Sequence, residues 1–300
     1  MPEIVEKCPL CGHEKNKLFD SRVFHGLRVE NRVCLHCGLV FQSPRMTGEE
    51  QETFYHETYR KLYQGNSGPT TKDIAVQRSR ADAAAVFAGR YLPKPVRMLD
   101  IGASSGLFLE RARDDIATEV AGIEPGRVYR EYAQSKGLKI YASLEEMYAA
   151  GENRFGLVSM MHVLEHMPYP VATLRELREK VLDRDGYLLV EVPNLYCHDS
   201  FEVAHMTAFS MHTLGEVMEK AGYEIVAAKK HGLPRSAILP LYLTVLAKPA
   251  EKPHDQIVPE HFVPVKRWLG LFARRVLQKL FPEKAWIPMP ELNDKTGGSL

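Results

Sequence analysis

Four of the five cysteines stand in two closely spaced pairs near the N-terminus. Each pair has two residues between its cysteines and a glycine after them, in the segments CPLCG and CLHCG. Two such turns can place four thiolates around one point, and a tetrahedral set of sulfur ligands suits Zn²⁺. The spacing therefore predicts a structural zinc site, with an iron site as the alternative. Its predicted ligands are Cys8, Cys11, Cys34 and Cys37.

A second group of residues with chemical potential follows the apolar run VRMLDIG at 96–102. Asp100 stands at the end of this predicted strand, and Gly102 and Gly106 follow it in the segment LDIGASSG. Glycines at such positions permit a tight turn and a close approach of the backbone to a ligand. Glu124 comes about 20 positions later, where an acidic residue binds the ribose of a nucleoside cofactor. The pattern predicts a nucleoside-binding site.

The glycine spacing separates the candidate cofactors. Dinucleotide sites carry G-x-G-x-x-G, whereas this chain has G-x-x-x-G, and it contains no phosphate-binding GxxxxGK[ST]. The carboxylate of Asp100 would repel a phosphate, but it can orient the amino group of an amino acid. S-adenosylmethionine (SAM) combines such an amino group with a ribose and has no phosphate. The residues therefore favour SAM over NAD.

Histidines supply the candidates for acid–base chemistry. His162 and His166 lie in the segment HVLEH at the end of a predicted strand, and His205 lies in AHMTAFS. A histidine suits proton transfer near neutral pH, and two histidines four positions apart share one face of a helical turn. We predict His162, His166 and His205 as catalytic residues. For His205 the alternative is that it braces its loop against the site.

The elements that would position these residues alternate along the chain. Strands are predicted at 96–102, 118–125, 138–142, 155–166 and 186–194. Helices are predicted between them, at 106–114, 126–136, 143–151 and 170–180. The alternation indicates an α/β fold with a parallel sheet and helices on both faces. The final strands, 223–230 and 241–249, follow a helix at 212–221 and have a short connection, so the last strand is expected to be antiparallel.

With these motifs, the chain resembles the class I SAM-dependent methyltransferases over about residues 90–250. LDIGASSGLFLE resembles the first motif of that family, AGIEP its acidic second motif, and FGLVSMMHVLEHMPYP and GYLLVEVPN its fourth- and fifth-strand motifs. The resemblance implies a Rossmann-like sheet of seven strands. It also implies contacts to SAM: Asp100, Gly102 and Gly106 with the methionine part, Glu124 with the ribose, and Met161 or His162 with the sulfonium.

Two further resemblances concern the substrate. A zinc ribbon ahead of this fold resembles bacterial methyltransferases of saccharide and secondary-metabolite pathways, including sugar C-methyltransferases. The segment 204–226 is similar to a stretch of small-molecule O- and C-methyltransferases. These resemblances imply a small-molecule or glycan acceptor. HVLEH also resembles ubiquinone-biosynthesis O-methyltransferases, whose acidic and histidine residues there bind a divalent metal, but here His162 replaces the first acid.

Four segments are predicted: a zinc ribbon (1–45), a linker with lid helices (46–92), the methyltransferase domain (93–250) and a C-terminal extension (251–300). In the second, Tyr55, Tyr59 and Tyr63 have helical spacing and either pack on the next domain or cover a ligand. In the last, residues 265–281 form a basic amphipathic helix. Such a helix either lies on an anionic membrane or packs on the domain or on a second subunit. The sequence leaves the oligomeric state open.

Length and composition narrow the class of protein. The chain has 300 residues, of which 45% are hydrophobic and 26% charged, and its net charge is +1. These values fit a globular protein and argue against a nucleic-acid partner. No signal peptide or membrane-spanning run is evident, so a cytoplasmic location is expected.

The combined prediction is an enzyme that transfers a methyl group from SAM to a hydroxyl or carbon of a glycan, sugar nucleotide or related metabolite. Two alternatives remain open at this point. One is an RNA methyltransferase that holds RNA with its ribbon. The other is a non-catalytic interaction protein that binds SAM.

Overall fold

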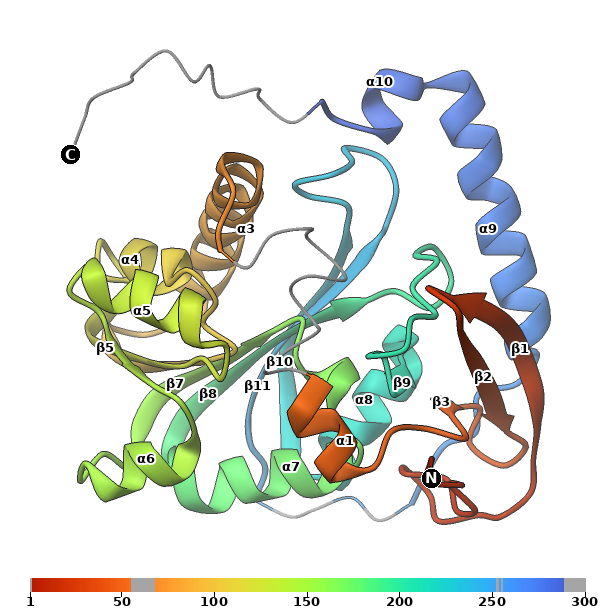
Figure 1. Cartoon of the computed structure of the whole chain (residues 1–300), viewed down its shortest axis with the longest axis horizontal. Helices are drawn as coiled ribbons and strands as arrows, with labels where there is room; N and C mark the ends of the chain where they lie inside the picture. The colour runs from red at the N-terminus through yellow and green to blue at the C-terminus, as the bar shows by residue number, and fades with distance from the viewer. Residues whose placement is uncertain (1, 55–67, 252–253, 255, 289–300) are drawn as a thin grey trace.

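The strands form two sheets, a larger one at the centre of the molecule and a smaller one at its side (Figure 1). The computed structural model describes residues 2–54, 68–251, 254 and 256–288 of the chain. The larger sheet has the strand order β10-β11-β8-β7-β4-β5-β6, in which β11 is antiparallel to both neighbours and the other neighbouring pairs are parallel. The predicted seven-stranded sheet with an antiparallel last strand is therefore confirmed. Its strands are β4 (Val96–Ile101), β5 (Ala117–Ile123), β6 (Lys139–Tyr141), β7 (Phe155–Met161), β8 (Leu182–Pro193), β10 (Tyr223–His231) and β11 (Tyr242–Pro249).

Helices cover both faces of this sheet, because its central strands are apolar on both sides. On β4, for example, Met98 packs in one hydrophobic cluster and Leu99 in another, as the two-residue period of a strand requires. The first cluster contains buried residues of α3 (Thr71–Gly89), α4 (Leu107–Ala112) and α5 (Arg127–Ser135). The second contains residues of α6 (Leu144–Ala149), α7 (Pro170–Glu176) with its continuation η3 (Leu177–Val181), and α8 (Met211–Lys220).

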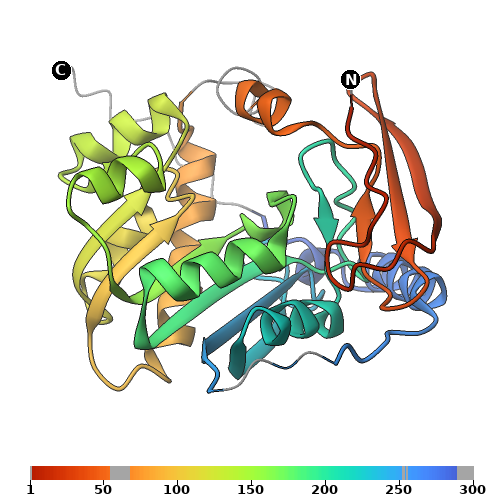
Figure 2. The same ribbon diagram turned by 90° about the horizontal axis from the view of Figure 1, so that it is seen from below.

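The smaller sheet holds the N-terminal segment beside the larger one (Figure 2). It consists of β1 (Asn16–Phe24), β2 (Leu27–Cys34), β3 (Val40–Gln42) and β9 (Thr207–Ala208), in that spatial order. The strands β1 and β2 form a hairpin with its turn at His25–Gly26, and both turn residues have positive φ angles. The fourth strand, β9, comes from beyond β8, so the small sheet includes a piece of the main domain.

The segment between the two sheets is described in part. It contains α1 (Gly48–Thr53), whose capping box is formed by Thr47 and Glu50, and then α3, which begins at Thr71 after the N-cap Thr70. Both helices lie within residues 46–92, for which the sequence predicts a linker with helices. The predicted aromatic helix with Tyr55, Tyr59 and Tyr63 lies outside the described residues.

The C-terminal extension forms α9 (Val263–Leu280) and α10 (Pro282–Ala285) at one edge of the molecule (Figure 1). Only Val263 and Arg267 of α9 are buried. The apolar side chains of the predicted amphipathic helix are exposed at Trp268, Leu269, Phe272, Val276 and Leu280. Of the helices in the described ranges, none is long and apolar enough to cross a lipid bilayer.

Candidate active site

A cavity of about 410 Å³ opens at the carboxyl ends of β4, β7 and β8. In open parallel sheets, ligands usually bind at the carboxyl ends of the strands. The helix α3 covers one side, with lining residues spaced by three or four positions. The β8–β9 loop (residues 194–206) and Arg235 supply much of the opposite side. Of the predicted site residues, the lining includes Asp100, Gly102, Met161, His162, His166 and His205.

Asp100 lies near the end of β4 and is 3% exposed. The hydroxyl of Ser159 on β7 donates a hydrogen bond of 2.6 Å to its Oδ1. Burial raises the pKa of Asp100 to about 7, because the charged carboxylate loses its hydration; the bond from Ser159 opposes this effect. A cation placed beside Asp100 would restore the charged form. The site therefore suits an amino group.

Gly102 begins the turn after β4 and must be a glycine for two reasons. Its φ is +77°, and a Cβ atom there would lie 2.5 Å from Cγ2 of Val163. The carboxylate of Glu124 ties this turn to the one after β5, since it accepts hydrogen bonds from the amides of Ser104 (2.8 Å) and Gly126 (2.9 Å). Glu124 and the α4 N-cap Gly106 do not line the cavity themselves; Ser104 does.

His162 follows β7 with a φ of +57°, a conformation that non-glycine residues adopt rarely and that often marks functional sites. Its Nε2 lies 3.1 Å from Oε1 of Glu191, a fully buried residue of β8. Arg80 from α3 lies 3.2 Å from the same oxygen, and His231 lies 3.1 Å from the other. Burial raises the pKa of Glu191, but these donors outweigh it and leave the pKa lowered.

A second cluster joins Glu165 and His166, on the short helix η2 (Leu164–His166), to His205 of the β8–β9 loop. One ligand atom from each lies within 4.8 Å of the others. His166 Nδ1 donates to the carbonyl of Ala204 (2.9 Å), and His205 Nδ1 donates to that of Ser200 (2.6 Å). Each ring therefore has Nε2 as its acceptor nitrogen. The arrangement can accept a proton or hold a divalent cation.

Burial and the neighbouring charges shift the pKa values of the residues in this cluster. Burial lowers the pKa of His166 to about 4, so that its ring is neutral near pH 7. Burial acts on Glu165 in the opposite direction, but the neighbouring rings of His162, His166 and His205 together outweigh it and hold the pKa at about 2. The ion-pair distance from His162 Nδ1 to Oε1 of Glu165 is 3.4 Å. The cluster thus combines a charged carboxylate with a neutral imidazole.

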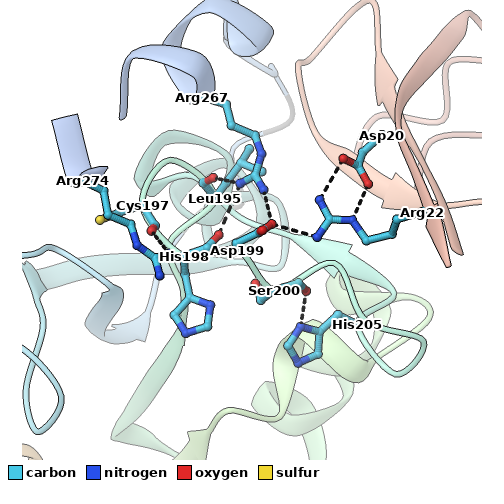
Figure 3. Close-up of polar contacts among 10 residues, drawn as sticks. All are labelled: Asp20, Arg22, Leu195, Cys197, His198, Asp199, Ser200, His205, Arg267 and Arg274. Atoms are coloured by element: carbon cyan, nitrogen blue, oxygen red, sulfur yellow. Dashed lines mark hydrogen bonds and ion pairs between the residues drawn. The ribbon is translucent and has the colours of Figure 1, made fainter. Parts of the chain in front are cut away.

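The β8–β9 loop that carries His205 is held from two sides (Figure 3). Oδ1 of Asp199 accepts hydrogen bonds from Arg22 of β1 (2.9 Å) and from Arg267 of α9 (3.0 Å). Arg267 also donates to the carbonyls of Leu195 and His198, and Arg274 of α9 donates to that of Cys197 (2.8 Å). The small sheet and the C-terminal helix therefore fix the loop that forms one wall of the cavity.

The four predicted zinc ligands meet at the end of the small sheet. Their sulfur atoms lie within 4.8 Å of one another, with 3.5 Å between Cys8 and Cys37 and between Cys11 and Cys34. The turn glycines Gly12 and Gly38 both have positive φ. Four sulfurs at this separation fit the tetrahedral coordination of a structural Zn²⁺.

Sequence reasoning overlooked several residues of the site. Glu191 and Ser159 sit inside apolar strand segments, where a lone polar residue among hydrophobic ones was the available signal. Arg80 and Tyr242 come from α3 and β11, at the two flanks of the cavity, and Arg80 lies over the Tyr242 ring at 5.3 Å. No local motif marks these last two residues.

A family model described as a methyltransferase domain matches residues 75–228, which is half of the chain. A ubiquinone biosynthesis O-methyltransferase of Cereibacter sphaeroides is 32% identical over 141 residues, which cover 45% of this chain and 55% of the relative. The chain thus spans about half the length of that curated relative.

Two solved structures are similar to this chain, and the first of them, with a TM-score above 0.5, shows the same general fold. One is the 1,6-didemethyltoxoflavin-N1-methyltransferase of Burkholderia thailandensis with bound 1,6-didemethyltoxoflavin and S-adenosylhomocysteine; it is 17% identical, has a TM-score of 0.54, and the match covers 73% of this chain and 98% of that one. A protein of Pyrococcus horikoshii OT3 is also 17% identical, with a TM-score of 0.47 and coverage of 65% and 98%. At these identities the likeness concerns the fold alone.

Proposed function

The chain belongs to the SAM-dependent methyltransferase family, and from this premise we propose that it methylates a hydroxyl or carbon of a glycan, sugar nucleotide or related metabolite. The observation that carries the proposal is one cavity that contains both the buried carboxylate of Asp100 and a histidine cluster. The first suits the cofactor and the second suits an acceptor that loses a proton.

The residues behind β4 and β5 fit SAM. Asp100 has a raised pKa and would bind the amino group of the cofactor, which restores its charge. Gly102 lets the backbone approach the methionine part, while Glu124, behind Ser104, would reach the ribose hydroxyls. Met161 and His162 line the cavity at the end of β7, where we place the sulfonium. SAM, when bound, supplies the methyl group and its positive sulfur.

We assign the general base to His205. Its Nδ1 donates to Ser200, so Nε2 can accept the proton of an acceptor hydroxyl. The carboxylate of Glu202 lies 3.9 Å from that nitrogen and would stabilise the imidazolium that forms. His162 is less suited, because both of its ring nitrogens face buried carboxylates, Glu191 and Glu165. His166 is buried and supports the ring of His205, whose centroid is 4.8 Å from its own.

Polar side chains on several sides of the cavity support a polyhydroxylated acceptor. Lys72 and Asp73 come from α3, Glu202 from the β8–β9 loop, and Arg235 from the β10–β11 connection. A sugar or glycan presents hydroxyls in many directions, and each needs a hydrogen-bond partner when it leaves water. The similarity to a relative named as an O-methyltransferase also supports a hydroxyl acceptor.

We further propose that the protein binds Zn²⁺ as a structural ion. Cys8, Cys11, Cys34 and Cys37 would bind it and fix the two turns from which the small sheet extends. Glu165, His166 and His205 could instead hold a catalytic divalent cation. Assays after brief EDTA treatment, with and without added Mg²⁺ or Mn²⁺, distinguish this role from that of the base.

The first test is isothermal titration of the zinc-loaded protein with SAM, S-adenosylhomocysteine and, as a control, NAD. We expect binding of the first two only. Turnover is then measured by S-adenosylhomocysteine release with sugar nucleotides, glycans and small phenols. Selective turnover with the phenols would contradict the proposed acceptor class.

The assignment of the base is tested with His205→Ala and His205→Gln. We expect a loss of turnover of about 10²- to 10⁴-fold with unchanged SAM affinity. His212→Gln is the matched control, because His212 is a half-exposed histidine outside the cavity. Full turnover by both His205 variants would remove this residue from the mechanism.

A further inference from the structure

The helix α9 is docked with its hydrophobic face turned away from the protein. Its large apolar side chains are exposed, with Trp268 64%, Phe272 53% and Leu280 64% accessible. They recur every three or four positions and thus form one stripe along the helix. We call this stripe the outer face; it consists of Val265, Trp268, Leu269, Phe272, Val276 and Leu280, none of them buried by another described residue.

Polar contacts, together with apolar contacts of Val263 and Leu277, hold the opposite side of α9 on the body of the protein. Arg267 is 7% exposed; it binds Asp199 and the backbone of the β8–β9 loop, and its guanidinium lies 4.2 Å from the centroid of the Phe201 ring. Two turns further along the helix, Arg274 donates a hydrogen bond to the carbonyl of Cys197 (Figure 3). Since these contacts fix the rotation of the helix, the outer face cannot turn inward without breaking them.

The charges beside the outer face are all positive. From His261 to Pro282 the sequence contains no aspartate or glutamate. Lys266 is paired with Glu260 at 3.0 Å, whereas Arg275 and Lys279 are exposed and make no ion pair with any described residue. These two cations are four positions apart and therefore lie along one edge of the stripe.

We propose that the outer face of α9 seats on an anionic lipid surface. Trp268 and Phe272, whose rings stack at 5.7 Å, would enter the boundary between headgroups and acyl chains, with Arg275 and Lys279 at the level of the lipid phosphates. Contact between two copies of this face would instead bring the same unpaired cations together, with no acid on the helix to balance them. The charge pattern therefore favours lipid over a second copy.

Lipid binding through α9 would place the enzyme at a membrane whatever its methyl acceptor is. The helix α9 lies at the edge of the molecule beside β1 (Figure 1). The inner side of α9 holds the β8–β9 loop, which forms a wall of the cavity. A lipid surface bound to α9 would thus leave the sheet and its SAM site intact.

The test is flotation of the full, zinc-loaded chain with phosphatidylcholine vesicles that contain or lack phosphatidylglycerol. We expect flotation with the anionic vesicles and its loss at high salt. Trp268→Ser with Phe272→Ser should lower the partition coefficient by about tenfold or more. Arg275→Gln with Lys279→Gln should weaken binding to anionic vesicles and reduce its salt dependence.

The matched control is Val23→Ser with Leu27→Ser, which removes exposed apolar side chains from the β1–β2 hairpin; this variant should float like the wild type. Titration with SAM checks that each variant is folded. No flotation of the wild type, or equal flotation of the Trp268/Phe272 variant, would overturn the proposal. Sedimentation that shows a dimer which only this variant dissociates, without lipid binding, would assign the face to a second copy instead.

Discussion

The buried carboxylates of Glu191 and Asp100 differ in how their negative charge is neutralised. Glu191 is surrounded by Arg80, His162 and His231, so its charge is neutralised within the protein. Asp100 has a hydroxyl partner, Ser159, and no cation within ion-pair distance among the described residues. A buried carboxylate in that state is unstable as an anion unless a ligand provides the positive charge. The difference supports the proposal that Asp100 recognises the amino group of the cofactor.

Replacement of Asp100 with asparagine tests this conclusion. Asp100→Asn keeps the size of the side chain and a hydrogen-bond acceptor but removes the charge that an amino group would meet. We expect SAM affinity to fall by about 10- to 100-fold, as for the loss of a charged hydrogen bond. Titration calorimetry measures it, with the exposed Asp114→Asn as control. Unchanged affinity would show that Asp100 does not contact the cofactor.

The same variant changes the pH dependence of stability. The pKa of Asp100 is about 7 in the folded protein and near 4 in the unfolded chain. The folded state therefore loses this proton at a higher pH than the unfolded state does. Stability of the ligand-free protein therefore falls between about pH 4 and 7, and the cost of ionisation is fully present above pH 7. Asp100→Asn should flatten this decline and be more stable at pH 8. Urea unfolding at several pH values measures the difference.

Loss of the charge on Glu191 should lower the free energy of unfolding. Glu191→Gln leaves Arg80, His162 and His231 around a neutral amide in a buried position. Removal of one partner of a buried ion pair typically costs about 3–5 kcal/mol of unfolding free energy. Glu119→Gln is the control, because its exposed pair with Arg97 should contribute only about 0–1 kcal/mol. Similar urea midpoints for the two variants would contradict this account.

Strand β9 connects the zinc site to the active site. It pairs with β3, and just before it the amide of Met206 donates to the carbonyl of Glu165 while its carbonyl accepts from the amide of Gln42. A chain of backbone hydrogen bonds therefore runs from the small sheet to the cluster of Glu165, His166 and His205. We infer that the small sheet contributes to the position of His205.

Removal of zinc should consequently loosen the β8–β9 loop. In protein treated with a strong chelator, or in Cys37→Ser, we expect faster amide hydrogen exchange in 194–206 as well as in β1–β3, because β9 loses its partner strand. Strands β4 and β5 serve as the internal control and should exchange as before. Faster exchange confined to β1–β3 would show that the loop holds its position without the small sheet.

At the scale of the molecule, one hydrophobic core joins the two sheets. The cluster that contains Leu99 and Val158 of the large sheet also contains Phe41 of β3 and, from the cysteine turns beside the small sheet, Leu10 and Leu39. Two parts with a continuous core unfold together, since neither retains its packing without the other. The zinc ribbon is therefore integrated with the methyltransferase fold.

This continuity predicts one thermal transition for the zinc-loaded chain. Circular dichroism and the fluorescence of a probe on the small sheet should give the same midpoint, and saturating SAM should raise both together. After chelation of zinc we expect two separate midpoints, of which only the later one responds to SAM. Two transitions in the zinc-loaded protein would show that the sheets are independent.

The sequence by itself determined the local elements and the residues that mark their ends. Runs of apolar residues located the seven strands, and the spacing of Cys8, Cys11, Cys34 and Cys37 located their cluster, because period and turn chemistry act over a few residues. The same holds for Asp100 and Gly102, which follow directly from the end of β4. Boundaries were less certain: β8 begins at Leu182, four residues before the predicted start.

Only the tertiary structure decided which of these elements meet. Glu191 binds Arg80 and His231, and His205 joins Glu165, across separations of 40 residues or more, set by the order of the strands. Periodicity shows that a residue faces inward or outward, but it does not name the neighbour on that side. For α9 the sequence left open whether its apolar residues meet a membrane, the domain or a second subunit, and only the tertiary structure shows Arg267 against the β8–β9 loop with Trp268 and Phe272 exposed.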